Sequence, residues 1–413
     1  MSSLLKVKNL RTTFSSDWGK REALDGVSFA VSEQEILCIV GESGSGKSVT
    51  ALSLMGLLPR NGCVVDGEAL FEGKDLLKMR PKELDKIRGG PMSMIFQDAI
   101  SSLNPVFTVG NQLIEAVRSH RRISRRAAKE EAKMLLKRVG LPGDDNMLER
   151  YPHALSGGMR QRVMIAMALA GKPKLLIADE PTTALDVTIQ AQIMYLLREL
   201  CEKEGLSVIL ITHDIGLVAQ MADRVLVMYA GQVVEQSYVH ELFDEPRHPY
   251  TRGLMQAVPS IYDDKENRLA SIPGTVPESY QDITGCRFAS RCKYTQESCY
   301  EPQPLRCNCT EDGQVFPHCV RCHRALAGTL PPYEAKEVGK GDEGVQELIA
   351  ERTAEAARSV EAAKTLEMAK AKEDTPCEEA AEAKAEKAAQ KLKRTKLKNI
   401  KKKGQADSEE ENT

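Results

Sequence analysis

Long apolar runs are missing from this chain of 413 residues. No stretch approaches the roughly 20 consecutive apolar residues that a membrane-spanning helix needs, which argues against an integral membrane protein. The first residues, Met1–Lys6, lack a basic start followed by an apolar stretch, so we expect no secretory signal. We therefore expect a soluble, cytoplasmic chain.

An excess of one charge is also missing, because 57 Lys and Arg residues face 59 Asp and Glu residues. Charge alone therefore gives no indication of nucleic-acid binding. Aromatic residues are scarce, and none follows Tyr333. Residues 333–413 are rich in Ala, Glu and Lys and too poor in large apolar residues to build a core. We expect a charged low-complexity tail, either a solvated helix or disordered.

The most informative stretch, residues 41–48, reads Gly-Glu-Ser-Gly-Ser-Gly-Lys-Ser and fits the phosphate-binding pattern G-x-x-x-x-G-K-[ST]. A β-branched apolar run, 35–40, precedes it and predicts a buried strand, and 48–58 has the apolar spacing of a helix. In such a loop the backbone N–H groups and the helix N-terminus face phosphates. Lys47 would bridge the phosphates and the Ser48 hydroxyl would bind Mg²⁺. The expected phosphate-binding residues are Gly41, Ser43, Gly44, Ser45, Gly46, Lys47 and Ser48.

Polar residues follow three further apolar strands, and open α/β sheets collect ligand groups at such strand ends. Gln97 follows 94–96 and could reach Mg²⁺ or an attacking water. Asp179 and Glu180 follow 175–178, where the first could hold Mg²⁺ and the second could polarise the water. His213 follows 207–212 and would reach the same edge.

Residues 155–162 read Leu-Ser-Gly-Gly-Met-Arg-Gln-Arg ahead of a helical stretch, 163–170. Ser156 predicts a helix N-cap, and Gly157 and Gly158 leave backbone donors open for an anion.

The other sequence patterns predict strands near the start of the chain and helices further along it. Alternating apolar residues predict antiparallel strands over 4–36, and the charged stretches 81–88 and 110–150 favour helices. Phe14 or Trp18 could stack on an adenine ring or be ordinary strand and loop residues. The chain therefore predicts an α/β fold that binds a nucleotide.

These residues, in this order and spacing, resemble the ATP-binding cassette (ABC) ATPases over roughly residues 4–255. The resemblance implies a RecA-like P-loop core, an antiparallel β subdomain and a helical signature subdomain at about 98–172, within an ATPase domain at 1–257. It also implies a dimer in which Ser156–Gly158 of one subunit caps the ATP held by another. Glu180 would be the catalytic base, His213 the γ-phosphate sensor, and Asp186 part of the loop joining the two sites.

A narrower resemblance is to the ATPase subunits of bacterial dipeptide and oligopeptide importers. It rests on the amino-acid sequences of residues 41–59, 96–105 and 155–169, and on His-Pro-Tyr-Thr-Arg-Gly-Leu at 248–254. It implies two separate permease subunits, a second and distinct ATPase subunit, an extracytoplasmic peptide-binding protein and a place on the cytoplasmic face of the membrane. No nucleic acid is expected.

Other functions remain open at this point. The ATPase subunits of nickel and glutathione importers share much of the same motif sequence. A soluble ABC ATPase acting on DNA or ribosomes, or a redox-sensing regulatory protein, would use a similar cassette.

Seven of the eleven cysteines fall between residues 286 and 322, in a segment, 258–332, that we expect to form a small second domain. In a reducing compartment such clustering favours a metal site over disulfides. The segment resembles the C-terminal part of peptide-importer ATPases, where four cysteines can hold an iron–sulfur cluster. Thiolates suit a [4Fe–4S] cluster or tetrahedral zinc, and empty thiols remain an alternative. The favoured ligands are Cys286, Cys292, Cys299 and Cys322, and the rival set is Cys307, Cys309, Cys319 and Cys322.

The cysteine segment contains no residue of the phosphate-binding loop or of the 155–162 stretch. We therefore expect nucleotide binding to be independent of it.

Overall fold

The structure is a computed structural model that describes residues 3–17, 19–98, 102–183, 185–258, 271–277, 279–307 and 318–333. The predicted tail from residue 334 onward therefore lies outside the described residues, as do Trp18 and Cys309. Among the described residues, no helix is both long enough and apolar enough to cross a membrane.

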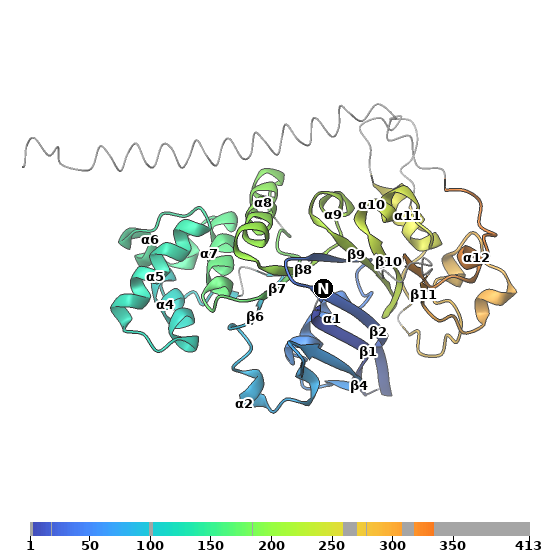
Figure 1. Ribbon diagram of the computed structural model, residues 1–413, viewed down its shortest axis with the longest axis horizontal. Helices are drawn as coiled ribbons and strands as arrows, with labels where there is room; N and C mark the ends of the chain where they lie inside the picture. Colours follow the sequence, from blue (N-terminus) through green and yellow to red (C-terminus); the bar gives the residue numbers. More distant parts are fainter. Residues whose placement is uncertain are drawn as a thin grey trace, which may run out of the picture. The chain divides into compact units, whose positions relative to one another are not determined.

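The strands form two sheets, with the orders β2-β1-β4-β5 and β11-β12-β10-β9-β3-β8-β7-β6. The first sheet is antiparallel, and strands β9, β3, β8, β7 and β6 of the second are parallel (Figure 1). The strands are β1 Ser3–Ser16, β2 Gly19–Ser32, β3 Ile36–Val40, β4 Gly62–Phe71, β5 Lys74–Asp75, β6 Met92–Ile95, β7 Leu175–Asp179, β8 Ser207–Thr212, β9 Arg224–Tyr229, β10 Gln232–Tyr238, β11 Arg306–Cys307 and β12 Cys319–Val320.

Helices cover the parallel strands, and α4 to α7 gather beyond the β6 edge (Figure 1). The helices are α1 Lys47–Met55, α2 Pro81–Leu84, α4 Val109–His120, α5 Arg125–Arg138, α6 Asp145–Glu149, α7 Gly157–Leu169, α8 Val187–Glu204, α9 Ile215–Met221, α10 Val239–Asp244, α11 Pro249–Ala257 and α12 His323–Leu326.

Strand β3 is buried on both faces, which explains its uninterrupted apolar sequence. Alternate side chains of a strand point to opposite faces. Ile36, Cys38 and Val40 therefore join the core shared with α4 to α9, whereas Leu37 and Ile39 join the core shared with α1 and the antiparallel sheet. The parallel sheet is the layer between two hydrophobic cores.

The predicted helices are confirmed with two corrections. The helix expected over 81–88 is short: α2 ends at Leu84, and Arg88 turns back to donate hydrogen bonds to the Met55 and Gly56 carbonyls at the end of α1, both at 2.6 Å. The helical region at 110–150 is divided into α4, α5 and α6. One division falls at Gly140, whose φ of 71° suits the left-handed backbone that ends many helices.

The carboxyl-terminal segment continues the cassette's own sheet. Strand β12 pairs antiparallel with β10, with Glu235 opposite Val320, and β11 pairs with β12. The cysteine-bearing region is therefore attached to the edge opposite β6 (Figure 1).

A buried ion pair ties β3 to β9 and β2. The Arg224 guanidinium lies 2.9 Å from the Glu35 carboxylate and donates to the Ala30 carbonyl at 3.1 Å. Both charged side chains are only 8% exposed, so breaking the pair would remove a buried charge–charge contact.

We predict that Glu35→Gln lowers the free energy of unfolding by about 3 kcal/mol, because it removes the carboxylate charge of a buried, hydrogen-bonded ion pair. Urea unfolding of the full chain measures this. The matched control is Lys203→Gln, which removes an exposed pair with Glu199 and should leave the urea midpoint unchanged. Equal losses in the two variants would contradict the account.

Candidate nucleotide-binding and hydrolysis site

The phosphate-binding loop turns between β3 and α1 with little room around its glycines. A Cβ on Gly41 would lie 2.2 Å from the Met228 carbonyl oxygen, and a Cβ on Gly46 would lie 2.8 Å from Leu24. Gly46 has a φ of 103°, which suits glycine, and no described side chain caps the helix that follows. The first N–H groups of α1 are therefore available to an anion.

Lys47 is buried and holds the loop closed. Its ammonium donates to the carbonyls of Gly41 at 2.8 Å and Glu42 at 3.0 Å. Burial lowers the pKa of Lys47, and the negative charges of Glu180 and Asp179 oppose that shift. The ammonium thus lies among acidic groups at the place where phosphates are expected.

Ser48 and Asp179 meet across the loop, with the serine hydroxyl donating to the carboxylate at 3.0 Å. Burial raises the pKa of Asp179, and the nearby charge of Glu180 acts in the same direction. Hydroxyl and carboxylate oxygens are the ligands that Mg²⁺ prefers, so this pair fits the predicted magnesium site.

Glu180 is held by side chains from its own turn and from the ends of two neighbouring strands. Gln97 and Thr183 donate to one carboxylate oxygen at 3.0 Å each, and His213 Nδ1 lies 3.3 Å from the other. Burial alone would raise the pKa of Glu180, but the hydrogen bonds from Thr183 and His213 outweigh it and lower the pKa. The group is therefore a carboxylate at neutral pH. Thr183 is a further site residue that no sequence pattern indicated.

The Glu180 backbone is unusual, with a φ of 46° that non-glycine residues seldom adopt. Its N–H donates to the Ile211 carbonyl at the end of β8, at 2.9 Å. This bond fixes the carboxylate at the edge where His213 also emerges. The predicted grouping of Gln97, Asp179, Glu180 and His213 around the loop is thus found in the structure.

The Ser156–Gly158 stretch starts α7, and the Ser156 hydroxyl caps the helix by accepting from the Met159 N–H at 3.4 Å. Gly158 packs tightly, because a Cβ there would lie 2.7 Å from Ile189. Gly157 is open: the nearest described atom is a Leu185 methyl at 3.5 Å. Within the described ranges, no hydrogen bond or ion pair joins this stretch to residues 41–48.

Comparisons with known proteins decide the family. Residues 24–183 match the ABC transporter family model, and residues 234–299 match the model of the oligopeptide/dipeptide transporter C-terminal region. A peptide import ATP-binding protein of Brucella melitensis is 52% identical over 302 residues, covering 73% of this chain and 91% of that protein. The chain belongs to the ABC transporter ATPases.

Two further comparisons agree with this assignment. The dipeptide transport ATP-binding protein DppD of Haemophilus influenzae is 50% identical over 332 residues, which cover 80% of this chain and 98% of DppD. The dimeric cassette MJ0796, in a post-hydrolysis state with ADP and phosphate, superposes with a TM-score of 0.52 at 30% identity, over 57% of this chain and 98% of that one. The α/β cassette fold and an ATP-hydrolysing cassette are thereby shown.

Two other predicted cassette residues have local structural partners. Asp186 caps α8, where its carboxylate accepts from the Ile189 N–H at 2.9 Å. The Phe14 ring lies against Gly62 of the neighbouring strand β4, so close that a Cβ on this glycine would be 2.7 Å from it. Phe14 therefore has a packing role within the antiparallel sheet.

The four favoured cysteines come together. Cys286, Cys292, Cys299 and Cys322 all line one small cavity beside His248. Burial raises the pKa of Cys286 to about 12, and the neighbouring Cys322 and Cys292 add to the shift.

The rival site is corrected by one observation. Cys319 is engaged in a disulfide bond, which removes it as a thiolate ligand and departs from the expectation of metal binding in place of disulfides. Within the described ranges, which include the four favoured cysteines, no group of three or more His, Cys, Asp or Glu side chains is placed to hold a metal ion.

We predict that Glu180→Gln keeps ATP binding but lowers the hydrolysis rate at least about 100-fold, because the amide cannot polarise water as a base does. Phosphate release by the assembled complex and ATP titration measure the two effects separately. Thr183→Val is the matched control: it removes one hydrogen bond to the carboxylate and should retain most of the activity. Normal hydrolysis by the Gln variant would exclude Glu180 as the base.

Proposed function

We propose that this chain is the ATP-hydrolysing subunit of an importer for dipeptides or oligopeptides. The observation that carries the proposal is the match of residues 234–299 to the oligopeptide/dipeptide transporter C-terminal region, in a chain whose cassette residues converge on one site. The names of the relatives, peptide import and dipeptide transport proteins, support the same substrate class.

In the proposed hydrolysis, each side chain has one task. Lys47 would neutralise the β- and γ-phosphates, and Ser48 and Asp179 would hold Mg²⁺, which would lower the charge on the phosphates. Glu180 accepts the proton of the attacking water, and His213, 3.3 Å from it, contacts the γ-phosphate. Gln97 donates to Glu180 at 3.0 Å and would be a further ligand of the metal ion.

The complete site is proposed to form between two ATPase subunits, this chain and a similar but distinct one. Ser156, Gly157 and Gly158 would cap the ATP of the partner, and Asp186 would lie in the loop between the two sites. The open surface over Gly157 supports this assignment. Packing within its own chain does not require a glycine at this position, because a Cβ there would fit without a clash.

The remaining partners follow from the function. Two permease subunits would carry the peptide across the membrane, an extracytoplasmic binding protein would deliver it, and this chain would sit on the cytoplasmic face. We assign residues 1–257 to the ATPase domain, with the helical subdomain at about 98–172, residues 258–332 to the cysteine-rich domain and 333–413 to the tail.

Co-purification from a mild detergent extract tests the assembly. The proposal expects two permease chains and a second ATPase chain, and uptake of labelled peptides by membranes that contain them. Recovery of nucleic acid or ribosomes would instead support a soluble ABC ATPase. Uptake of nickel or glutathione without peptide uptake would assign the complex to those importers.

We predict that Gly157→Asp leaves ATP binding by the isolated subunit unchanged but prevents ATP-dependent dimer closure. The new carboxylate would face the γ-phosphate of the partner's ATP, and like charges repel strongly in a closed site. Light scattering with ATP measures closure, and Gly157→Asn, which adds a side chain of the same size without the charge, separates charge from bulk. A Gly157→Asp subunit that closes normally would refute the shared site.

We further propose that Cys286, Cys292, Cys299 and Cys322 hold a [4Fe–4S] cluster. All four line the same cavity, and the Nε2 atom of His248, which lines it too, is buried without a hydrogen-bond partner among the described residues. Zinc, the alternative, would need its thiolates within about 2.3 Å of one ion. A cluster spreads four thiolates over a larger body and supplies the charge that such buried thiolates need.

The cluster proposal predicts brown protein after anaerobic purification, with about four irons and four sulfides per chain. Replacing Cys286, Cys292 or Cys299 by Ser should remove the colour, because each is a ligand. Cys63→Ser, at an exposed cysteine of β4, is the matched control and should stay brown. Colourless protein with one zinc per chain would overturn the cluster.

A further inference from the structure

Glu42, the second residue of the phosphate-binding loop, is held at three points. Its N–H donates to the Tyr250 hydroxyl at 2.8 Å, and its carbonyl accepts from Lys47 at 3.0 Å. Its carboxylate accepts from the Arg291 guanidinium at 2.8 Å. Two of these three partners lie outside the loop and its helix, in α11 and in the cysteine segment.

The carboxylate of Glu42 is electrostatically unfavourable for the loop's task. It lies in the turn that receives a triphosphate, and its charge already acts on the pKa of Lys47. An unneutralised carboxylate there would repel the phosphates. Arg291 cancels that charge and holds the side chain to one side.

Arg291 is itself held rigidly. Its guanidinium donates to the carbonyls of Pro273 at 2.7 Å and Gly274 at 3.1 Å, and to the Tyr229 hydroxyl at 3.3 Å. It also lies over the Phe288 ring, 5.9 Å from the ring centre, and its side chain is 6% exposed. Because its other donors are engaged, the guanidinium cannot leave Glu42 without breaking several bonds.

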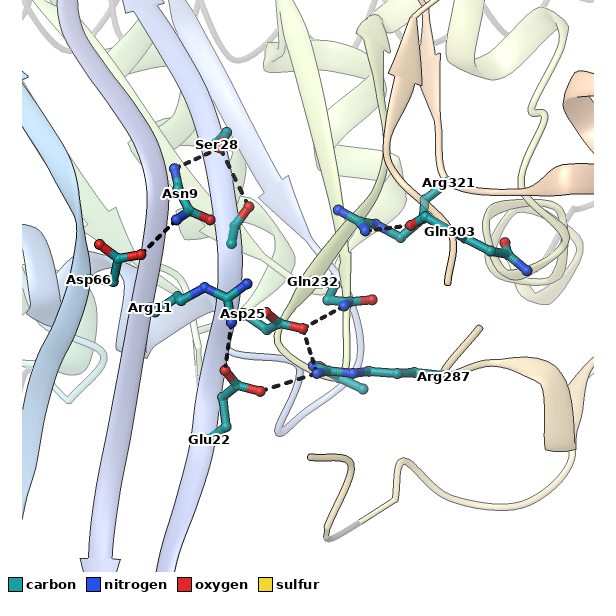
Figure 2. Close-up of polar contacts among 12 residues, drawn as sticks. Asn9, Arg11, Glu22, Asp25, Ser28, Asp66, Gln232, Arg287, Gln303 and Arg321 are labelled. Carbon is teal, nitrogen blue, oxygen red and sulfur yellow. Dashed lines mark hydrogen bonds and ion pairs between the residues drawn. The ribbon is translucent and has the colours of Figure 1, made fainter. Parts of the chain in front are cut away.

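A second arginine of the same short segment reaches the other side of the loop. Figure 2 shows Arg287 between Glu22 and Asp25 of β2, at 3.3 and 2.7 Å. Arg287 also donates to the Ala230 carbonyl at 2.6 Å.

Gly231, which follows Ala230 in the chain, connects the Arg287 contact to the phosphate-binding loop. Its N–H donates to the carbonyl of Ser45 at 3.0 Å, and its own carbonyl accepts from the Asp25 N–H at 2.9 Å. Residues 286–292 therefore support the loop from two directions.

We propose that Arg291 is a positioning residue for ATP binding: it neutralises Glu42 and, with Tyr250, keeps it turned from the phosphates. Nucleotide affinity then depends on the carboxyl-terminal segment, contrary to the independence expected from the sequence. The inference rests on ATP binding by the cassette and not on the transported substrate or on the cluster.

The test compares Arg291→Met with Arg252→Met in the full chain by calorimetric titration with MgATP. Arg252 is a matched control, because it too donates to backbone carbonyls (Pro246 and Pro331) and lies over a ring (Tyr333), but does not contact Glu42. We expect affinity about 5- to 20-fold weaker for Arg291→Met. The Arg252 variant should bind as the unaltered chain does.

The second arm separates charge from structure. Glu42→Gln removes the charge that Arg291 neutralises, so adding it to Arg291→Met should restore affinity to within about twofold of the unaltered chain. Higher salt should also reduce the defect of the single variant, because it screens the repulsion. Arg291→Lys keeps the charge, so its affinity for MgATP should lie between that of Arg291→Met and that of the unaltered chain. It replaces Arg291→Met in the comparison if the Met variant does not fold.

Two results would overturn the proposal. Unchanged affinity in Arg291→Met would show that the contact does not position the loop. A double variant as weak as Arg291→Met, with a defect that salt does not alter, would show that Arg291 supports the fold only.

Discussion

The cassette depends on keeping opposite charges close together at the carboxyl ends of buried parallel strands. Lys47 lies among Asp179, Glu180 and Glu42, and its ammonium is held by the Gly41 and Glu42 carbonyls. Buried charges are stable only when they are paired and hydrogen-bonded. The two hydrophobic cores on either face of the sheet fix the strands, and the strand ends in turn fix these groups. This grouping of one ammonium with several carboxylates suits a ligand such as MgATP, in which an anion is bound together with a cation.

The carboxyl-terminal segment takes part in the same charge balance. Strand β12 joins the edge of the cassette sheet, and Glu235 beside it accepts from the N–H groups of Arg247 and His248, at 2.7 and 2.9 Å. The helix that starts there presents Tyr250 to the loop, and the cysteine cavity borders its first residues. One buried carboxylate thus fixes the helix start that links the thiol cavity to the loop.

The sequence predicted what depends on local patterns and failed where distant residues meet. The loop, its strand and the polar strand ends could be identified because spacing within one element determines them. The contact between Glu42 and Arg291 spans 249 positions, and no periodicity encodes which distant partner an arginine meets. The helix at 81–88 was predicted too long, because Arg88 finds acceptors at the end of α1. The disulfide at Cys319 was missed because spacing cannot separate thiolate ligands from bridged cysteines.

The central claim is that this ATPase drives peptide uptake, and the most direct measurement is ATP hydrolysis by the whole transporter in liposomes. The permeases, both ATPase subunits and the binding protein would be reconstituted, and phosphate release would be followed with and without peptide. The account predicts that peptide-loaded binding protein raises the hydrolysis rate several-fold over binding protein alone, and that labelled peptide accumulates in step. A rate that ignores peptide but rises with nickel or glutathione would contradict it.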